Sequence, residues 1–209
     1  MKKSNFSLLL LIFCFATSYA QVGLRAGLNL ANITGDTDFL GDNLQSAKGL
    51  QLGITYSIGL NDKLSIRPGA VYSVKGYRDN GDDTKFKTVF NYLEIPIDIV
   101  LGVYDSEAFG IDLHAGPYLG YILSGYFEED GDREDLDFSE ENNQGVARND
   151  FGLNLGLTLN FSGVFAGINY GLGLGNLVDE GDNNINATLK NINVSIIAGY
   201  MFGGGFVAK

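Results

Sequence analysis

Cysteine, basic charge and long apolar runs are scarce in this chain, and each scarcity excludes a class of protein. The single cysteine, Cys14, lies in an apolar N-terminal segment, so the chain beyond it can form no disulfide. Lipidation of Cys14 is excluded as well, because Ile12 and Phe13 stand where a lipoprotein signal needs small residues. No stretch has the ~20 consecutive apolar residues of a transmembrane helix, although 45% of the residues are hydrophobic.

The first 20 residues have the pattern of an export signal. Lys2 and Lys3 precede an apolar run over residues 8–16 that is too short to span a membrane, and Ser18-Tyr19-Ala20 is a small-x-small cleavage site. We expect a signal peptide over residues 1–20 and one domain over residues 21–209, with an uncleaved anchor helix as the alternative. Without the two lysines the chain has 12 basic and 25 acidic residues, a net charge of −13. This charge excludes nucleic acid as a partner, because phosphate binding needs a basic surface.

Apolar residues alternate with small or polar ones over most of the chain, clearly so from Gly49 to Leu60. A period of two predicts β-strands. The alternating segments are longer than the 5–6 residues of an ordinary strand and suit the roughly 9–11 residues of a tilted strand that crosses a bilayer. The eight predicted strands are Val22–Ile33, Lys48–Leu60, Leu64–Tyr77, Val89–Val103, Gly110–Tyr126, Asp150–Phe161, Val164–Leu174 and Leu189–Phe202.

The connections between these strands alternate in length. Residues 61–63, 104–109 and 162–163 are short turns, whereas 34–47, 78–88, 127–149 and 175–188 are long and polar. This alternation is typical of an all-β, eight-stranded antiparallel up-and-down transmembrane barrel of an outer membrane. We therefore expect both termini on the periplasmic rim and the long loops outside the cell.

A soluble barrel that binds a ligand in the periplasm also has eight strands and an export signal. Its second strand face would meet water, yet here that face carries small residues such as Gly53, Ser57 and Gly156. Small residues suit the crowded interior of a narrow barrel, where a few long side chains need room. Tyrosines on the apolar faces (Tyr56, Tyr72, Tyr121, Tyr170 and Tyr200) fit an interfacial girdle. Both observations favour the membrane barrel.

Several charged residues alternate with the apolar residues of their strands, so they fall on the face that points into the barrel. They predict a network in the barrel interior. They are Arg67, Lys75, Glu94, Asp98, Asp112 and His114. Buried charges must be paired, so the main interpretation is an ion-pair network that fills the interior. The alternative is an outer-membrane enzyme in which His114 acts as a base oriented by Asp98. We expect no catalytic residue and no cofactor, because no Ser-His-Asp set has a recognisable spacing.

The 127–149 loop concentrates acidic residues around Arg133. It predicts either a solvated loop or a weak surface calcium site, with Asp130, Asp132, Asp135 and Asp137 as candidate ligands. The EF-hand pattern is missing, so we assign no metal site. The last strand ends on Tyr200-Met201-Phe202, which resembles the C-terminal signal read by the barrel-assembly machinery, although residues 203–209 follow it.

Four segments of the chain are distinctive when taken in order. They are Gly23-Leu24-Arg25-Ala26-Gly27-Leu28-Asn29, Tyr92-Leu93-Glu94-Ile95-Pro96-Ile97, Gly116-Pro117-Tyr118-Leu119-Gly120-Tyr121 and Asn149-Asp150-Phe151-Gly152-Leu153-Asn154. Together they resemble the PorT-like outer-membrane β-barrel family of Bacteroidetes. The resemblance implies an eight-stranded barrel in the outer membrane of a Gram-negative bacterium, without enzymatic activity, and a structural role for Glu94 and Pro96. We expect a structural or interaction protein that contacts outer-membrane lipid, the barrel-assembly machinery and an envelope or surface partner.

Overall fold

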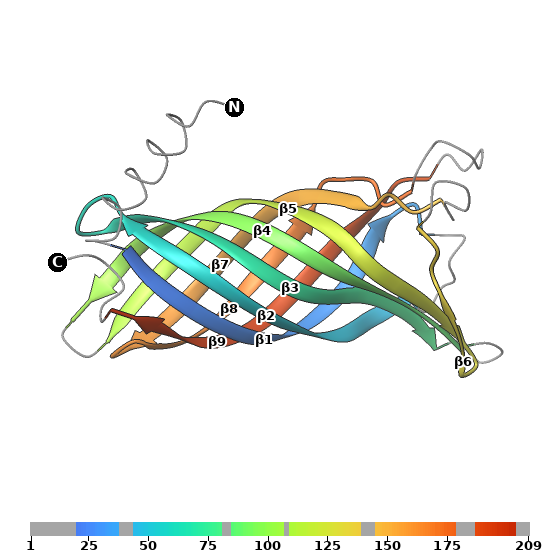
Figure 1. Cartoon of the computed structure of the whole chain (residues 1–209), viewed down its shortest axis with the longest axis horizontal. Helices are drawn as coiled ribbons and strands as arrows, with labels where there is room; N and C mark the ends of the chain where they lie inside the picture. The colour runs from blue at the N-terminus through green and yellow to red at the C-terminus, as the bar shows by residue number, and fades with distance from the viewer. Residues whose placement is uncertain are drawn as a thin grey trace, which may run out of the picture.

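The computed structural model describes residues 20–37, 44–80, 85–106, 109–138, 145–178 and 187–203, which form a β-barrel (Figure 1). The expected signal peptide lies outside this part of the chain except for Ala20. The strands are β1 Ala20–Gly35, β2 Leu44–Gly59, β3 Leu64–Asn80, β4 Lys85–Asp105, β5 Gly110–Glu129, β6 Asp132–Asp135, β7 Asn149–Phe161, β8 Val164–Gly173 and β9 Leu189–Phe202. No helix in the described residues is long and apolar enough to cross a bilayer.

Eight of these strands close a ring in which every neighbouring pair is antiparallel. Sequence neighbours pair from β1 to β5, then β5 pairs with β7, β7 with β8 and β8 with β9. The ring closes where β1 pairs with β9, from Val22 opposite Phe202 to Gly35 opposite Leu189. The predicted fold class is therefore confirmed. Closure leaves no sheet edge within the ring, which a strand structure in lipid requires.

The 127–149 segment is not wholly a loop, and this part of the prediction was wrong. Strand β5 continues to Glu129, where residues 127–129 pair with residues 86–88 of β4, and β6 folds back on it. Asp130 and Gly131 form the turn between them, with φ angles of 49° and 99° that suit a two-residue hairpin. The prediction missed this extension because its residues are charged rather than alternating. In Figure 1, β3, β4 and β5 run together to the far end of the molecule, where β6 lies.

Short turns close the opposite rim, as predicted. Ser162 and Gly163 have φ angles of 47° and 92° and join β7 to β8 as a two-residue hairpin. The Asn61 side-chain oxygen accepts hydrogen bonds from the backbone N–H groups of Lys63 and Leu64, each at 2.9 Å, and so fixes the turn between β2 and β3. Strand β1 begins and strand β9 ends on this same rim (Figure 1).

The barrel is apolar outside and polar inside. Outward-facing Leu50, Ile54 and Leu155 are 50–62% exposed, whereas inward-facing Asn29 and Asp112 are at most 2% exposed. A soluble barrel would have the opposite arrangement, because apolar surface is driven out of water. The soluble ligand-binding alternative is therefore wrong for this chain.

Aromatic rings border the apolar belt at both rims. Phe109 lies 4.9 Å from Phe161 between ring centroids at the short-turn rim, and Tyr200 lies 5.0 Å from Phe202. Tyr72 and Tyr121 lie at the other border and are 42% exposed. Two such girdles mark the two membrane interfaces of an outer-membrane barrel.

Apolar clusters lie inside the barrel near both ends. Phe165, Ile197 and Met201 form one near the short-turn rim. At the long-loop end, residues before β7 and after β8 are joined by a bridge between Val146 and Val178. Two further clusters there are centred on Ile33, Leu177 and Leu189, and on Phe90, Tyr92 and Ile122. The polar interior thus lies between apolar clusters.

Candidate functional site in the barrel interior

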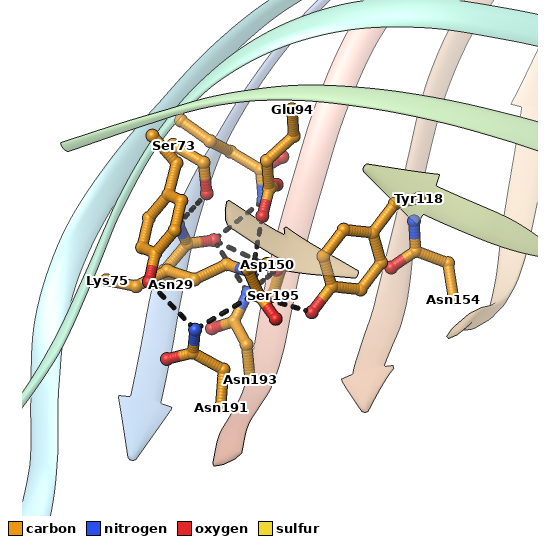
Figure 2. Close-up of polar contacts among 12 residues, drawn as sticks. Asn29, Ser73, Lys75, Glu94, Tyr118, Asp150, Asn154, Asn191, Asn193 and Ser195 are labelled. Carbon is orange, nitrogen blue, oxygen red and sulfur yellow. Dashed lines mark hydrogen bonds and ion pairs between the residues drawn. The ribbon is translucent and has the colours of Figure 1, made fainter. Parts of the chain in front are cut away.

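Asn29 is the centre of a hydrogen-bond network that joins strands on one side of the interior. Its side-chain oxygen accepts hydrogen bonds from Gln51 at 2.8 Å, Ser195 at 2.9 Å and Asn193 at 3.3 Å. Its amide nitrogen donates to Ser73 Oγ and to the Val74 carbonyl, both at 3.0 Å. These partners come from β2, β3 and β9, so one fully buried amide links four strands. Figure 2 shows Asn29, Ser73, Asn193 and Ser195 turned toward one another.

Lys75 forms a buried ion pair with Glu94 beside this network (Figure 2). Their side chains are 4% and 12% exposed. The Lys75 ammonium also lies 5.3 Å from the centroid of the Tyr92 ring and 4.7 Å from that of Tyr118. Two aromatic faces and one carboxylate therefore replace the water that the ammonium loses on burial.

Asp150 extends the network to β7. Its Oδ2 accepts hydrogen bonds from the Tyr118 hydroxyl at 3.0 Å and from Asn191 Nδ2 at 2.9 Å. The Asn191 amide also donates to the Tyr92 hydroxyl at 2.9 Å. The rings that contact Lys75 are therefore held in place by their own hydroxyl groups. The second carboxylate oxygen of Asp150 and the side-chain oxygen of Asn191 are buried without a hydrogen-bond partner, so the network is only partly satisfied.

A second charged group lies nearer the short turns. Arg67 and Asp112 approach to 3.7 Å, and Asn160 donates to Asp112 at 2.8 Å. Asp98 lies directly opposite Arg67 in the strand register. Arg25 donates to Gln51 at 3.0 Å and so connects this group to the Asn29 network. Among the described residues, these two groups contain three basic residues (Arg25, Arg67 and Lys75) and four acidic ones (Glu94, Asp98, Asp112 and Asp150), and Asp79 is buried on the same face of β3 as Lys75.

His114 is buried, and its partners differ from those of the enzyme hypothesis. Its Nε2 lies 3.2 Å from Asn169 Oδ1, and its Nδ1 lies 3.5 Å from Thr158 Oγ1. Neither partner is a carboxylate, whereas the hypothesis required Asp98 as the orienting group. The ring occupies the space beside Gly156, where a Cβ atom would overlap it. His114 thus fills the interior and bonds to an amide and a hydroxyl group.

All six charged residues that we expected inside the barrel face the interior. The structure divides them into a Lys75–Glu94 pair, an Arg67–Asp98–Asp112 group and the separate His114. Sequence reasoning missed two charged residues of the network, Arg25 and Asp150, and its uncharged members, chiefly Asn29, Tyr118 and Asn191. The alternation along each strand would have found them, because all five lie on the strand face opposite the apolar one.

The candidate metal ligands do not gather around one point. The Asp130 carboxylate accepts the backbone N–H of Lys85 at 3.1 Å, and Asp135 accepts from Arg133 at 2.8 Å. Within the ranges that the structure describes, no group of three or more His, Cys, Asp or Glu side chains could hold a metal ion. Asp132 and Asp137 lie on or near the same exposed hairpin.

A family model agrees with this architecture. It is described as outer membrane protein beta-barrel domain and matches residues 5–179. Ail of Yersinia pestis is 18% identical, with a TM-score of 0.43 and coverage of 88% of this chain and 99% of that chain. Neisserial surface protein A is 14% identical, with a TM-score of 0.47 and coverage of 86% and 96%. The outer membrane enzyme PagL is 14% identical, with a TM-score of 0.43 and coverage of 85% and 97%. No curated protein matches the chain.

Proposed function

Because the chain belongs to the outer membrane protein beta-barrel domain family, we propose that it is a non-catalytic barrel that presents its long-loop end to a protein partner at the cell surface. Within this family we assign it to the PorT-like type of Bacteroidetes, on the four segments that resemble that type. Residues 1–20 would direct export, and the barrel-assembly machinery would insert the mature chain with its termini in the periplasm.

The observation that carries this proposal is the exposed strand β6. Its residues Asp132–Asp135 are all exposed, and β6 lies at the end of the sheet order, paired only with β5 among the described strands. Its outer edge therefore offers unpaired backbone N–H and C=O groups, which can pair with an extended segment of another chain. Three of its four residues are acidic, so the fitting partner is a basic extended segment.

The interior supports a non-catalytic role. A general base must reach its substrate within hydrogen-bond distance, but His114 is 4% exposed and bonded to Asn169 and Thr158. We expect the His114→Ala variant to lose some stability and no activity. An assay of lipid or peptide hydrolysis in which wild type is active and folded His114→Ala is inactive would revive the enzyme hypothesis.

Orientation can be tested with single cysteines, because the chain after residue 20 has none of its own. Glu134→Cys places a thiol on β6, and Lys63→Cys places one in the short turn after β2. A membrane-impermeant maleimide applied to intact cells should label position 134 alone and should label position 63 only after permeabilisation. The reverse pattern would refute the proposed orientation.

The partner can be tested with a photo-crosslinking residue at position 133 in living cells. We expect a discrete adduct that disappears when Asp132→Asn and Glu134→Gln remove charge from the same strand. The same crosslinker at position 63 is the matched control on the opposite rim. Adducts that survive neutralisation, or that are identical from both positions, would contradict a role for β6.

A further inference from the structure

A row of long polar side chains crosses five neighbouring strands on the outer surface at the long-loop end. In order from β2 to β6, the row consists of Gln45, Arg78, Lys87, Glu128 and Arg133, each directly opposite the next. Directly opposite residues share one face of a sheet. Arg78 lies six residues after lipid-facing Tyr72 on β3, and an even spacing puts both on the same face. The β3–β4 register is uninterrupted between the two residues, so no bulge reverses the faces. The row, called here the cationic row, therefore faces outward.

The charge of the cationic row is opposite to that of the chain. It holds three cations and one carboxylate, in a chain whose net charge is −11. Arg78 and Lys87 are directly opposite, and like charges in that position destabilise a sheet. The ion pairs among the described residues are Arg67–Asp112, Lys75–Glu94 and Arg133–Asp135, so neither Arg78 nor Lys87 has a carboxylate partner within 4.0 Å there. Arg78 Nη2 donates to Gln45 Oε1 at 3.3 Å, whereas Arg78 Nε is buried without a hydrogen-bond acceptor. Two adjacent cations with no described carboxylate within 4.0 Å can hold an anion between them.

Tyr126 gives this site an aromatic surface. Lys87 Nζ donates to the Tyr126 hydroxyl at 3.2 Å, and the Arg133 guanidinium lies 3.9 Å from the centroid of the Tyr126 ring. Arg133 Nε and Nη2 donate to Asp135 at 3.1 and 2.8 Å, so its other N–H groups remain to meet phosphate oxygens. Cations around a half-buried phenol ring fit a ligand that joins anionic groups to a sugar.

The height of the cationic row above the membrane indicates which anionic lipid headgroup can reach it. On β4 the outward apolar residues run from Val103 to Leu93, which at the usual rise and tilt is about 25 Å in height, the thickness of the apolar band. Lys87 lies six residues beyond Leu93, or about 15 Å above the belt. Phospholipid headgroups reach only about 5–7 Å beyond the hydrocarbon. A lipid whose phosphates are carried on sugars extends further and can meet the row.

We propose that the cationic row binds the phosphorylated sugar headgroup of an outer-leaflet glycolipid. Arg78 and Lys87 would neutralise a phosphoryl group between them, and Tyr126 with Arg133 would contact the adjoining sugar. The assignment of the leaflet rests on the proposed function, which places the long loops outside the cell. The cysteine-labelling experiment tests that placement separately.

Binding can be measured on the full chain in detergent, with purified lipopolysaccharide as the probe. We expect the double variant Arg78→Gln/Lys87→Gln to bind at least tenfold more weakly than wild type. Lys63→Gln, an exposed cation on the opposite rim, should stay within twofold. Removing the phosphates from the lipopolysaccharide should weaken wild-type binding as much as the double variant does. Equal binding by the double variant and wild type would overturn the proposal, as would equal binding of the dephosphorylated probe.

Two further probes separate the possible sources of phosphate. Vesicles of anionic phospholipid and inorganic phosphate should each compete poorly with lipopolysaccharide, and competition at equal phosphate concentration by either would overturn the glycolipid assignment. Stability provides the last readout. Arg78→Gln removes a like-charge contact, so the ligand-free variant should unfold at the same temperature as wild type or higher. Lost binding together with lowered stability would indicate a structural role instead.

Discussion

Replacing Lys75 with methionine would leave Glu94 as an unpaired charge inside the barrel. The two side chains are only 4% and 12% exposed, so water cannot take the place of the lost ammonium. Removing one partner of a buried ion pair costs about 3–5 kcal/mol, and the lost contacts with the Tyr92 and Tyr118 rings act in the same direction. We expect Lys75→Met to lower the free energy of unfolding by about 3–5 kcal/mol, more than a hundredfold in the unfolding equilibrium.

Two companion variants test this reasoning. Lys75→Met/Glu94→Gln removes both charges, so it should recover more than half of the lost stability. Arg133→Met breaks an ion pair whose side chains are 57% and 77% exposed, and it should cost less than about 1 kcal/mol. Unfolding in urea can be followed by circular dichroism and by gel mobility with and without boiling, because the chain has no tryptophan to report it. Equal losses from Lys75→Met and Arg133→Met would refute the argument from burial.

Three further predictions follow from the barrel geometry. Ile54→Arg places a charge on the lipid-facing side and should cost about 2–4 kcal/mol in bilayers, measured as urea unfolding in liposomes; no loss there would contradict a lipid contact at this position. Gly156→Ala puts a methyl group into the space of the His114 ring and against the Ile168 carbonyl, so it should cost about 1–3 kcal/mol, and His114→Ala in the same chain should relieve only the part due to the ring. Asn29→Ala leaves Gln51 without its hydrogen-bond acceptor in the interior and should cost about 2–4 kcal/mol, whereas equal stability would show that water replaces the amide.

The strands of the ring could be predicted because lipid outside and a narrow interior inside impose a strict period of two. The strand segments that extend beyond the membrane were not predicted, because this constraint does not act on them. Strand β4 begins at Lys85 rather than Val89, and the register between β4 and β5 shifts at Asn91/Tyr92. Beyond that irregularity the outward face is no longer apolar, so hydrophobic alternation gives no signal. Strand β6 was missed for the same reason, since its sequence is Asp-Arg-Glu-Asp.

The interior site could be predicted as a set of residues but not as a set of contacts. Parity placed Arg67, Asp98, Asp112 and His114 inside the barrel, and the structure agrees. Contacts between inward residues depend on the register of each strand against its neighbours around the whole ring. A single sequence does not reveal these registers. Arg67 therefore approaches Asp112 across two strand boundaries, and His114 bonds to Asn169 on β8. Neither contact could be predicted by counting residue positions along the individual strands.

The distribution of charge argues that the working surfaces lie outside the barrel rather than within it. Inside, basic and acidic residues are held among amides and hydroxyls, between apolar clusters at both ends. Outside, the acidic edge of β6 and the cationic row meet at Glu128 and Arg133, which are directly opposite each other. A phosphorylated headgroup drawn to Arg78 and Lys87 would repel the carboxylates of β6. Lipid binding at Arg78 and Lys87 would therefore push the outer edge of β6 away from the membrane. A protein partner could then reach that edge.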